Sequence, residues 1–346
     1  MGNELARAPL EALDAMSQSS SDNATPQVTK KKQYKAHDLE KKDNCVDHPR
    51  MLVLQKETYP GIQQADSSKK LNLRILSLDG GWFRCATSLE VLRGLEERLG
   101  EEKPIGSFFD IIVGTAGSAL AAVLLGTKQK SVLDIIKIYE HIGKQGLLND
   151  TVVFETFLHS LLDGLDFQTP SQQQPLVFVV IPDDTKHVHV YGSHIKSDVS
   201  VYEAVLATSA SAAFKPVILG GYSFTGRGML VDNPTCVAGQ IINQMFPGSQ
   251  WHCVVSLGTG LPHEEQVSDE SPFLPSESYF FRLSPYGLSS ATPTVYDAAT
   301  FQALRAVGQN YCVDQRWLLS KIVQLLSALP TVIIGGREDL PVIDLR

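Results

Sequence analysis

The sequence predicts an α/β fold in which a mostly parallel sheet carries helices on both faces. Short, continuously apolar runs alternate with longer amphipathic segments between residues 72 and 327, and several of the runs end at a glycine turn. Continuous apolar runs are typical of strands buried on both faces, and their alternation with helices is typical of a parallel sheet. With 43% hydrophobic and 20% charged residues, the 346-residue chain has enough apolar material for a large core.

The first half of this region predicts two strands that are each followed by a helix. NLRILSL (72–78) alternates and then becomes continuously apolar, which indicates a buried strand, and DGGWFR (79–84) follows as a glycine-containing turn. Leucines then recur at helical spacing over 85–100. FFDIIVG (108–114) predicts a second buried strand, and the small, alanine-rich segment 115–126 suits a helix that packs closely on a sheet.

The second half continues the alternation. The segment SVLDIIKIYEHIGKQ is amphipathic at helical spacing, whereas PLVFVVIP, HVHVY and CVVSLGTG are short and rich in β-branched or aromatic residues. The remaining predicted elements are therefore strands at 175–182, 187–191 and 253–260, and helices at 131–145, 200–209 and 296–327, the last being one or two long helices.

Residues 1–71 differ in composition from the predicted domain at 72–346. They contain a stretch rich in serine, asparagine and glutamine and three lysine clusters, with almost no apolar periodicity, which predicts a disordered tail. Its lysines would attract an anionic membrane surface or an acidic partner, although a solvated linker is the simpler interpretation. The net charge of −8 argues against nucleic acid as a partner.

The cysteines and the N-terminus indicate a cytoplasmic protein, with peripheral membrane contact only through the tail. The five cysteines are odd in number and show no metal-binding spacing, which is typical of free thiols in a reducing compartment. The N-terminus has no apolar signal core, and Gly2 lacks the serine or threonine at position 6 that favours myristoylation. We find no run of eighteen apolar residues that predicts a membrane span.

The segment Gly114–Ser118 carries the strongest chemical signal. It reads G-T-A-G-S between a predicted strand and a predicted helix, where serine acyl hydrolases have the G-x-S-x-G nucleophile elbow. In such an elbow the serine oxygen projects at a helix N-terminus, where backbone N–H groups stabilise developing negative charge. Ala116 occupies the position of the serine and has no oxygen.

Five segments in succession resemble motifs of the patatin-like phospholipase family. They are LSLDGGWFR, FFDIIVGTAGSALAAVLLG, ATSASAAFKP, VDNPT and SLGTG. The resemblance covers residues 73–260, and helices at 296–327 fit the family. It implies a patatin-like three-layer fold and hydrolysis of lipid acyl esters by a Ser–Asp dyad, without a metal or cofactor. A glycine-rich turn in this family supplies the N–H groups of the oxyanion site.

Carried over residue by residue, the resemblance implies a degenerate dyad. The nucleophile position is Ala116, and counting back from Asn233 places the base at Gly226. The third glycine of the oxyanion turn has become Trp82 and the last has become Cys85. If the third position needs a positive φ, tryptophan there costs about 1–2 kcal/mol or the turn changes shape. The retained residues are Asp79, Gly80, Gly81 and Arg84 in the turn and Gly114, Thr115 and Gly117 in the elbow.

Three nearby residues are candidate substitutes for the lost dyad. Ser118 lies two residues past the elbow, a rotation of about 200°, so we expect it to face the helix–sheet packing. Asp232 follows the base position by six residues and is more simply a turn residue. Cys85 is a competent nucleophile only if its pKa is lowered, and no histidine lies near it in sequence.

The histidines offer a weak metal hypothesis. His187 and His189 alternate on a predicted strand, so both rings lie on one face, and His194 follows. No third ligand or carboxylate is evident in the pattern, so we predict an edge-strand surface and no metal site.

The leading interpretation is a patatin-like pseudoenzyme that binds a lipid, an acyl chain or an acyl-derived intermediate, with a protein partner as a further option. Removing the nucleophile of a serine hydrolase lowers turnover by about 10⁶, roughly 8 kcal/mol, so dyad chemistry is not expected. The alternative is a divergent acyl hydrolase, lactonase, cyclase or acyl-transfer accessory of lipid or polyketide biosynthesis that uses relocated residues. A gene product without a present role is a third interpretation.

Overall fold

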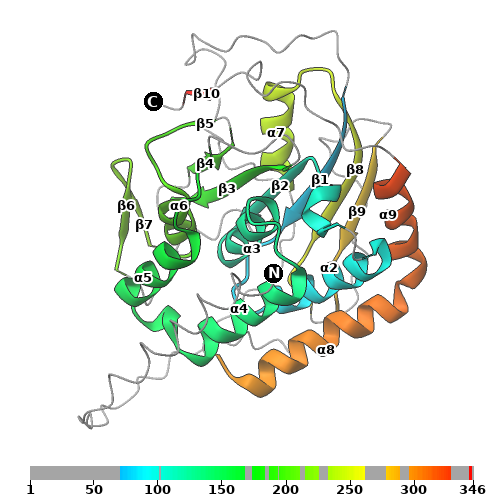
Figure 1. The fold of residues 1–346 in the computed structure, drawn as a ribbon, viewed down its shortest axis with the longest axis horizontal. Coiled ribbons are helices and arrows are strands. Elements are labelled where there is room, and N and C mark those ends of the chain that lie inside the picture. Colours follow the sequence, from blue (N-terminus) through cyan, green and yellow to red (C-terminus); the bar gives the residue numbers. More distant parts are fainter. Residues whose placement is uncertain are drawn as a thin grey trace, which may run out of the picture. The chain divides into compact units, whose positions relative to one another are not determined.

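A six-stranded sheet forms the centre of the fold in the computed structural model of the chain (Figure 1). Neighbouring strands along the sheet are β4 (Val188–Gly192), β3 (Leu176–Pro182), β2 (Ile111–Thr115), β1 (Asn72–Leu78), β8 (Gln250–Leu257) and β9 (Tyr279–Leu283). All neighbours are parallel except β3 and β4. The mostly parallel sheet predicted from the sequence is therefore confirmed.

The structure describes ten stretches of the chain. They are residues 71–100, 103–167, 174–183, 187–193, 195–210, 215–225, 233–261, 278–288, 296–328 and 343–344. The predicted tail, the base position Gly226, Asp232 and His194 lie outside the described residues.

Helices and smaller elements surround the sheet. The helices are α2 (Cys85–Leu99), α3 (Gly117–Gly126), α4 (Val132–Lys144), α5 (Thr151–Leu162), α6 (Val201–Thr208), α7 (Thr235–Met245), α8 (Ala298–Asp314) and α9 (Arg316–Ala328). The short elements are the 3-10 turns η1 (Ile105–Phe108) and η2 (Leu147–Asn149), and the strands β5 (Ile195–Lys196), β6 (Val217–Leu219), β7 (Tyr222–Phe224) and β10 (Ile343–Asp344).

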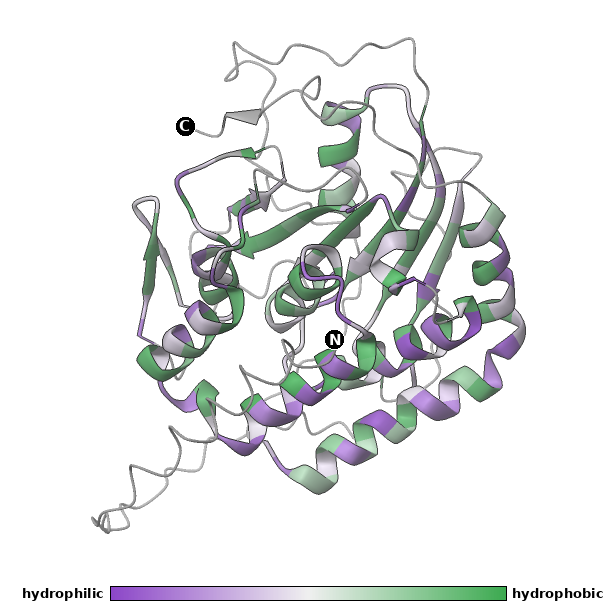
Figure 2. Ribbon diagram, in the orientation of Figure 1, coloured by the Kyte–Doolittle hydropathy of each residue, from purple (hydrophilic) through white to green (hydrophobic). Residues whose placement is uncertain are grey.

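Helices pack on both faces of the sheet, which gives the predicted three layers. On one face α7 packs in a hydrophobic cluster with β1, β2 and β3. The opposite face carries α3, because a side chain on Gly114 of β2 would meet Ala122 of α3, and Gly126 of α3 lies against Val177 of β3. The strands are strongly apolar, whereas α4 and α8 alternate apolar and polar residues (Figure 2). The apolar runs of the sequence thus form strands that helices cover on both faces of the sheet.

The second predicted strand begins later than expected. Residues 105–108 form η1 instead, and β2 starts at Ile111. A side chain on Gly106 would lie 2.3 Å from the carbonyl oxygen of Leu125, so this turn packs directly on the last turn of α3. Of the predicted strand at 108–114, Phe108 therefore belongs to η1 and β2 begins three residues later. The following helix begins at Gly117 rather than at residue 115, because Thr115 and Ala116 complete the strand and its turn.

The order of the strands determines where a site can form. The chain moves outward from β1 through β2 to β3 and later returns to the other side of β1 with β8 and β9. Ligands of open parallel sheets bind at the carboxyl ends of the strands where the strand order reverses in this way. The turn after β1 lies at this point. None of the helices in the described part of the chain combines the length and apolar character needed to cross a membrane.

Candidate functional site

The turn between β2 and α3 has the strained backbone of a nucleophile elbow. Ala116 adopts φ 48° and ψ −137°, a backbone conformation that residues other than glycine rarely adopt. Its N–H donates to Thr208 Oγ1 over 2.8 Å, and the Thr208 hydroxyl donates to the carbonyl of Val180 over 2.8 Å. The buried Tyr139 hydroxyl donates to the carbonyl of Gly117. The surrounding fold therefore holds the elbow in place although the serine is absent.

The glycine turn after β1 lies directly against the elbow. A Cβ atom on Gly80 would be 3.2 Å from the Cβ of Ala116. Gly81 has φ 140°, and a Cβ there would lie 2.9 Å from the Thr259 hydroxyl, so both positions favour glycine. No described residue accepts a hydrogen bond from the amides of Gly80 and Gly81. The backbone of Gly80 thus lies beside the Ala116 methyl group, and the amides of this turn are the groups from which acyl hydrolases build an oxyanion site.

Trp82 packs over the elbow and shows no backbone strain. The positive φ angles of described non-glycine residues occur at Ala116 and Gln129, so Trp82 has an ordinary φ and the expected strain is absent. A side chain on Gly117 would lie 2.7 Å from the Cα atom of Trp82. The indole contacts Phe154 edge-on, with ring centroids 5.3 Å apart, and lies 6.5 Å from Tyr139. It therefore turns toward α4 and α5 and remains half-buried.

Four partly exposed residues make up the surface of the site. Ala116, Gly80, Gly81 and Trp82 are each partly exposed. The neighbouring Thr115, Gly117, Asp79 and Phe83 are buried. Among these four residues, a molecule that reached this point would contact a methyl group, an indole ring and glycine backbone, and none of the four carries a hydroxyl or thiol group.

Replacing Ala116 by glycine is expected to stabilise the protein. A non-glycine residue in such a region stores about 1–3 kcal/mol, and glycine adds about 0.5–1 kcal/mol of unfolded-state entropy, so the free energy of unfolding should rise by about 1 kcal/mol. Urea unfolding measures the change. Ala119→Gly in the buried part of α3 is the matched control and should lose about 1 kcal/mol. Equal losses in both variants would contradict the strain at Ala116.

The two described substitutes for the nucleophile are both buried. Ser118 is 3% exposed within α3, in agreement with a packing role. Cys85 is 1% exposed, and its burial raises the pKa of the thiol well above the usual range. A thiol that stays protonated is a poor nucleophile. Asp232, the candidate base, lies outside the described residues.

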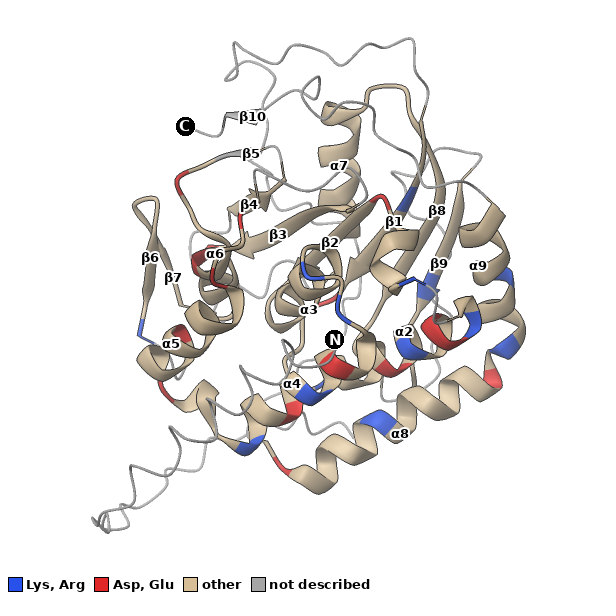
Figure 3. Cartoon of the chain, viewed as in Figure 1, with Lys and Arg blue, Asp and Glu red and all other residues tan. Residues whose placement is uncertain are grey.

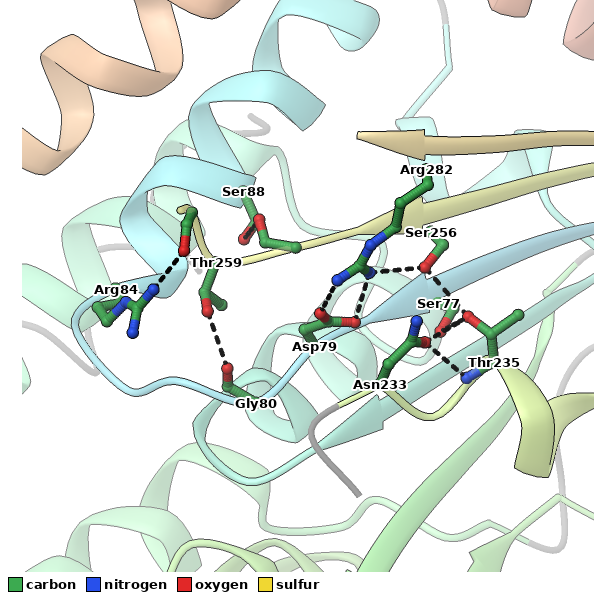
Figure 4. Close-up of polar contacts among 12 residues, drawn as sticks. Ser77, Asp79, Gly80, Arg84, Ser88, Asn233, Thr235, Ser256, Thr259 and Arg282 are labelled. Atoms are coloured by element: carbon green, nitrogen blue, oxygen red, sulfur yellow. Dashed lines mark hydrogen bonds and ion pairs between the residues drawn. The ribbon is translucent and has the colours of Figure 1, made fainter. Parts of the chain in front are cut away.

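Asp79 and Arg84, two retained residues of the turn, are both held by partners in β9 and in the loop after β8. Arg282 of β9 forms a two-pronged ion pair with Asp79, with Nη1 donating to Oδ1 over 2.8 Å (Figure 4). Arg84 donates to the carbonyl of Gly260 in the loop after β8. Arg282 lies beyond the recognised motifs, so sequence reasoning missed it, as it missed Thr208, although Thr208 lies within the ATSASAAFKP segment. The sequence offered no signal for Arg282, because residues 279–283 were not predicted as a strand.

The two histidines lie where the sequence placed them, but a carboxylate joins them. His187 and His189 belong to one face at edge strand β4, and Asp183 contacts both, at 3.5 Å from His187 Nδ1 and 2.9 Å from His189 Nε2. The His189 ring also packs on Tyr222. No group of three metal-ligating side chains suited to an ion occurs among the described residues. The cluster therefore ties the end of β3 to β4 and the β6–β7 hairpin.

A strained strand-to-helix elbow with a glycine turn at its side defines the scaffold of a serine acyl hydrolase in the α/β class. The family model described as patatin-like phospholipase matches residues 76–238, which include both the turn and the elbow. Together with the relatives described next, this match identifies residues 76–238 as a patatin-like phospholipase family domain.

Individual relatives are distant. The chain is 25% identical to calcium-independent phospholipase A2-gamma of Mus musculus over 272 residues, 67% of this chain and 34% of that protein. It is 26% identical to patatin-like protein 2 of Arabidopsis thaliana over 242 residues, 54% of this chain and 59% of that protein. The chain thus spans about a third of the length of the first of these relatives.

Two solved structures match this chain at low similarity. VipD from Legionella pneumophila matches with a TM-score of 0.44 and 12% identity, over 75% of this chain and 70% of that chain. Human GIVD cytosolic phospholipase A2 in complex with methyl gamma-linolenyl fluorophosphonate matches with a TM-score of 0.42 and 12% identity, over 75% of this chain and 59% of that chain.

Proposed function

We propose that this protein is a catalytically degenerate patatin-like protein that binds a lipid acyl group without cleaving it. The observation that carries the proposal is the conformation of Ala116. The chain keeps the strained elbow and the adjacent amides of Gly80 and Gly81, but a methyl group takes the place of the attacking oxygen. Amide donors can hold a carbonyl or carboxyl oxygen in the ground state, whereas covalent catalysis needs a nucleophile.

The proposed ligand class follows from the surroundings of the site and from the family. The partly exposed indole of Trp82, supported from behind by the buried Phe154 ring, lies in the same turn as the two amides, which suits an apolar chain with one oxygen-bearing end. The relatives are named phospholipases and patatin-like proteins. A lipid acyl group has both an apolar chain and an oxygen-bearing end. We extend the proposed ligand class to acyl-derived biosynthetic intermediates, which have the same two parts.

Relocated catalysis is the competing proposal, and the described residues count against it. Ser118 and Cys85 are buried, and the thiol of Cys85 is held in its protonated form. Contact of the lysine-containing tail with an anionic membrane or an acidic protein stays a prediction.

A fluorescent fatty acid tests the binding function. We expect stearate labelled with an anthroyloxy group to bind saturably and to quench tryptophan fluorescence, while the 4-nitrophenyl ester of a long-chain acid is not hydrolysed above background. Trp82→Ala should weaken binding about tenfold, because it removes most of an aromatic contact surface worth about 1–2 kcal/mol. Trp317→Ala is the matched control, since Trp317 is 72% exposed on α9. Absence of saturable binding, or equal effects of the two variants, would sink the proposal.

A further inference from the structure

Arg282 makes the charged contact that connects β9 to the turn beside the elbow. Its guanidinium pairs with the Asp79 carboxylate through two nitrogen–oxygen contacts, and both side chains are largely buried. Two parallel N–H···O bonds fix the plane of a carboxylate as well as its distance, which a single contact does not do. Asp79 immediately precedes Gly80, whose backbone abuts Ala116. The ion pair therefore restrains the first residue of the turn.

The same guanidinium also takes part in a hydrogen-bonded series of hydroxyl groups. Arg282 Nη1 donates to Ser256 Oγ over 2.8 Å, and the Thr235 hydroxyl lies 3.1 Å from the Ser256 oxygen (Figure 4). Thr235 in turn contacts Ser77 Oγ at 2.9 Å and donates to Asn233 Oδ1. These contacts run from β9 across β8 and β1 to the start of α7.

These hydroxyl contacts end at Asn233, two residues before α7. Asp79, at the other end, begins the oxyanion turn. One guanidinium thus contacts the turn directly and is linked to the start of α7 through Ser256 and Thr235.

The loop after β8 completes the support of the turn. A side chain on Gly258 would lie 3.0 Å from Arg282 Nη2 and 2.5 Å from Ser284 Oγ, so glycine makes room for the guanidinium. The next residue, Thr259, donates from its hydroxyl to the carbonyl of Gly80 over 3.1 Å. The backbone of the turn is therefore fixed on the Asp79 side by Arg282 and at Gly80 by Thr259.

We propose that Arg282 is a positioning residue that holds the turn Asp79–Gly81 against the elbow. The inference goes beyond the proposed function, because it concerns the geometry of the turn whether or not a ligand is bound. It rests on the proposed function only for the effect on acyl binding.

Fluorine NMR of the full chain labelled with 5-fluorotryptophan tests the positioning role. The chain has three tryptophans, Trp82 in the turn, Trp251 at the start of β8 and Trp317 on α9, which are assigned by single phenylalanine replacements. We expect Arg282→Gln to shift or broaden the Trp82 resonance and to leave the other two unchanged. Arg282→Lys keeps the charge but loses the two-pronged contact, so it should produce a smaller change at Trp82.

Arg305 provides a matched control. It is also a partly buried arginine paired with a buried carboxylate, that of Glu90, but it lies on α8. Arg305→Gln should destabilise the protein without moving the Trp82 resonance. In the double variant Arg282→Gln with Asp79→Asn, no unpaired buried charge remains, so stability should recover in part while Trp82 stays displaced.

The outcomes separate positioning from general stability and from ligand binding. An unmoved Trp82 resonance in folded Arg282→Gln, or a displacement of the same size in Arg305→Gln, overturns the inference. The labelled stearate should bind about tenfold more weakly to Arg282→Gln, a loss typical of removing a group that orients the contacting atoms. If the unmodified protein binds no stearate while Trp82 still moves, the proposed function fails and the positioning role stands.

Discussion

The variant Ala116→Ser with Gly226→Asp is expected to react covalently with a fluorophosphonate, whereas the unmodified protein is not. Ala116 already has the elbow backbone, and the backbone of Gly80 lies against it, so a serine there would place its oxygen beside the glycine turn. The second substitution places an acid at the position that the resemblance assigns to the base. Loss of a nucleophile costs about 10⁶ in turnover, and we expect at least about 10² to return, measured as ester hydrolysis.

Single variants identify the source of the gain. Ala116→Ser alone should react slowly, because its hydroxyl lacks a base, and Gly226→Asp alone should not react. Ser118→Ala in the double variant should leave the gain intact, since Ser118 is buried in α3. A folded double variant without any gain would show that Trp82 or the altered turn, and not the missing dyad, prevents catalysis.

Asp110→Ala is expected to lower the free energy of unfolding by about 3–5 kcal/mol. Arg74 and Asp110 form a buried pair, each 1% exposed, with Nη2 2.9 Å from Oδ1 and Nε 3.1 Å from Oδ2. Arg74 lies in β1, inside a sheet whose strands are otherwise largely uncharged (Figure 3). Its Nη1 also donates to the carbonyl of Leu326 and so attaches α9 to the sheet. Removing the carboxylate leaves a buried guanidinium without its counter-charge.

Denaturant unfolding with two controls checks this prediction. Lys137→Ala breaks an exposed ion pair with Asp134 and should change stability by less than about 0.5 kcal/mol. Arg74→Met combined with Asp110→Leu removes both charges and should restore much of the loss, because an apolar pair of similar volume needs no compensation. A loss below about 1 kcal/mol in Asp110→Ala would contradict the role of the buried pair.

The parts of the fold that depend on local pattern could be predicted from sequence. The strand at 72–78 and the helix after it were predicted nearly to the residue, because a continuous apolar run and helical leucine spacing are local signals. The position of Ala116 in an elbow was also readable, since small residues between a strand and a helix favour a tight turn. Its backbone angles confirm that interpretation of the local structure.

The elements and site contacts that were not predicted from the sequence depend on long-range contacts. The turn η1 packs on the backbone of the last turn of α3, and the short edge strand β9 has little pattern of its own. Arg282 reaches Asp79 across 203 positions of sequence, and Thr208 reaches Ala116 across 92. Neither pairing leaves a periodic trace, so the support of the site could not be found without the arrangement of the strands. Gly226 and Asp232 keep the roles assigned by resemblance as predictions.

The mass of the intact unmodified protein after incubation with an excess of a long-chain fluorophosphonate tests the central claim most directly. The claim is that the elbow is retained while its covalent chemistry is lost, so we expect no added mass, with the Ala116→Ser, Gly226→Asp variant as the positive control for the reagent. An adduct on the unmodified protein, mapped to Ser118, Cys85 or any other residue at the elbow, would contradict it.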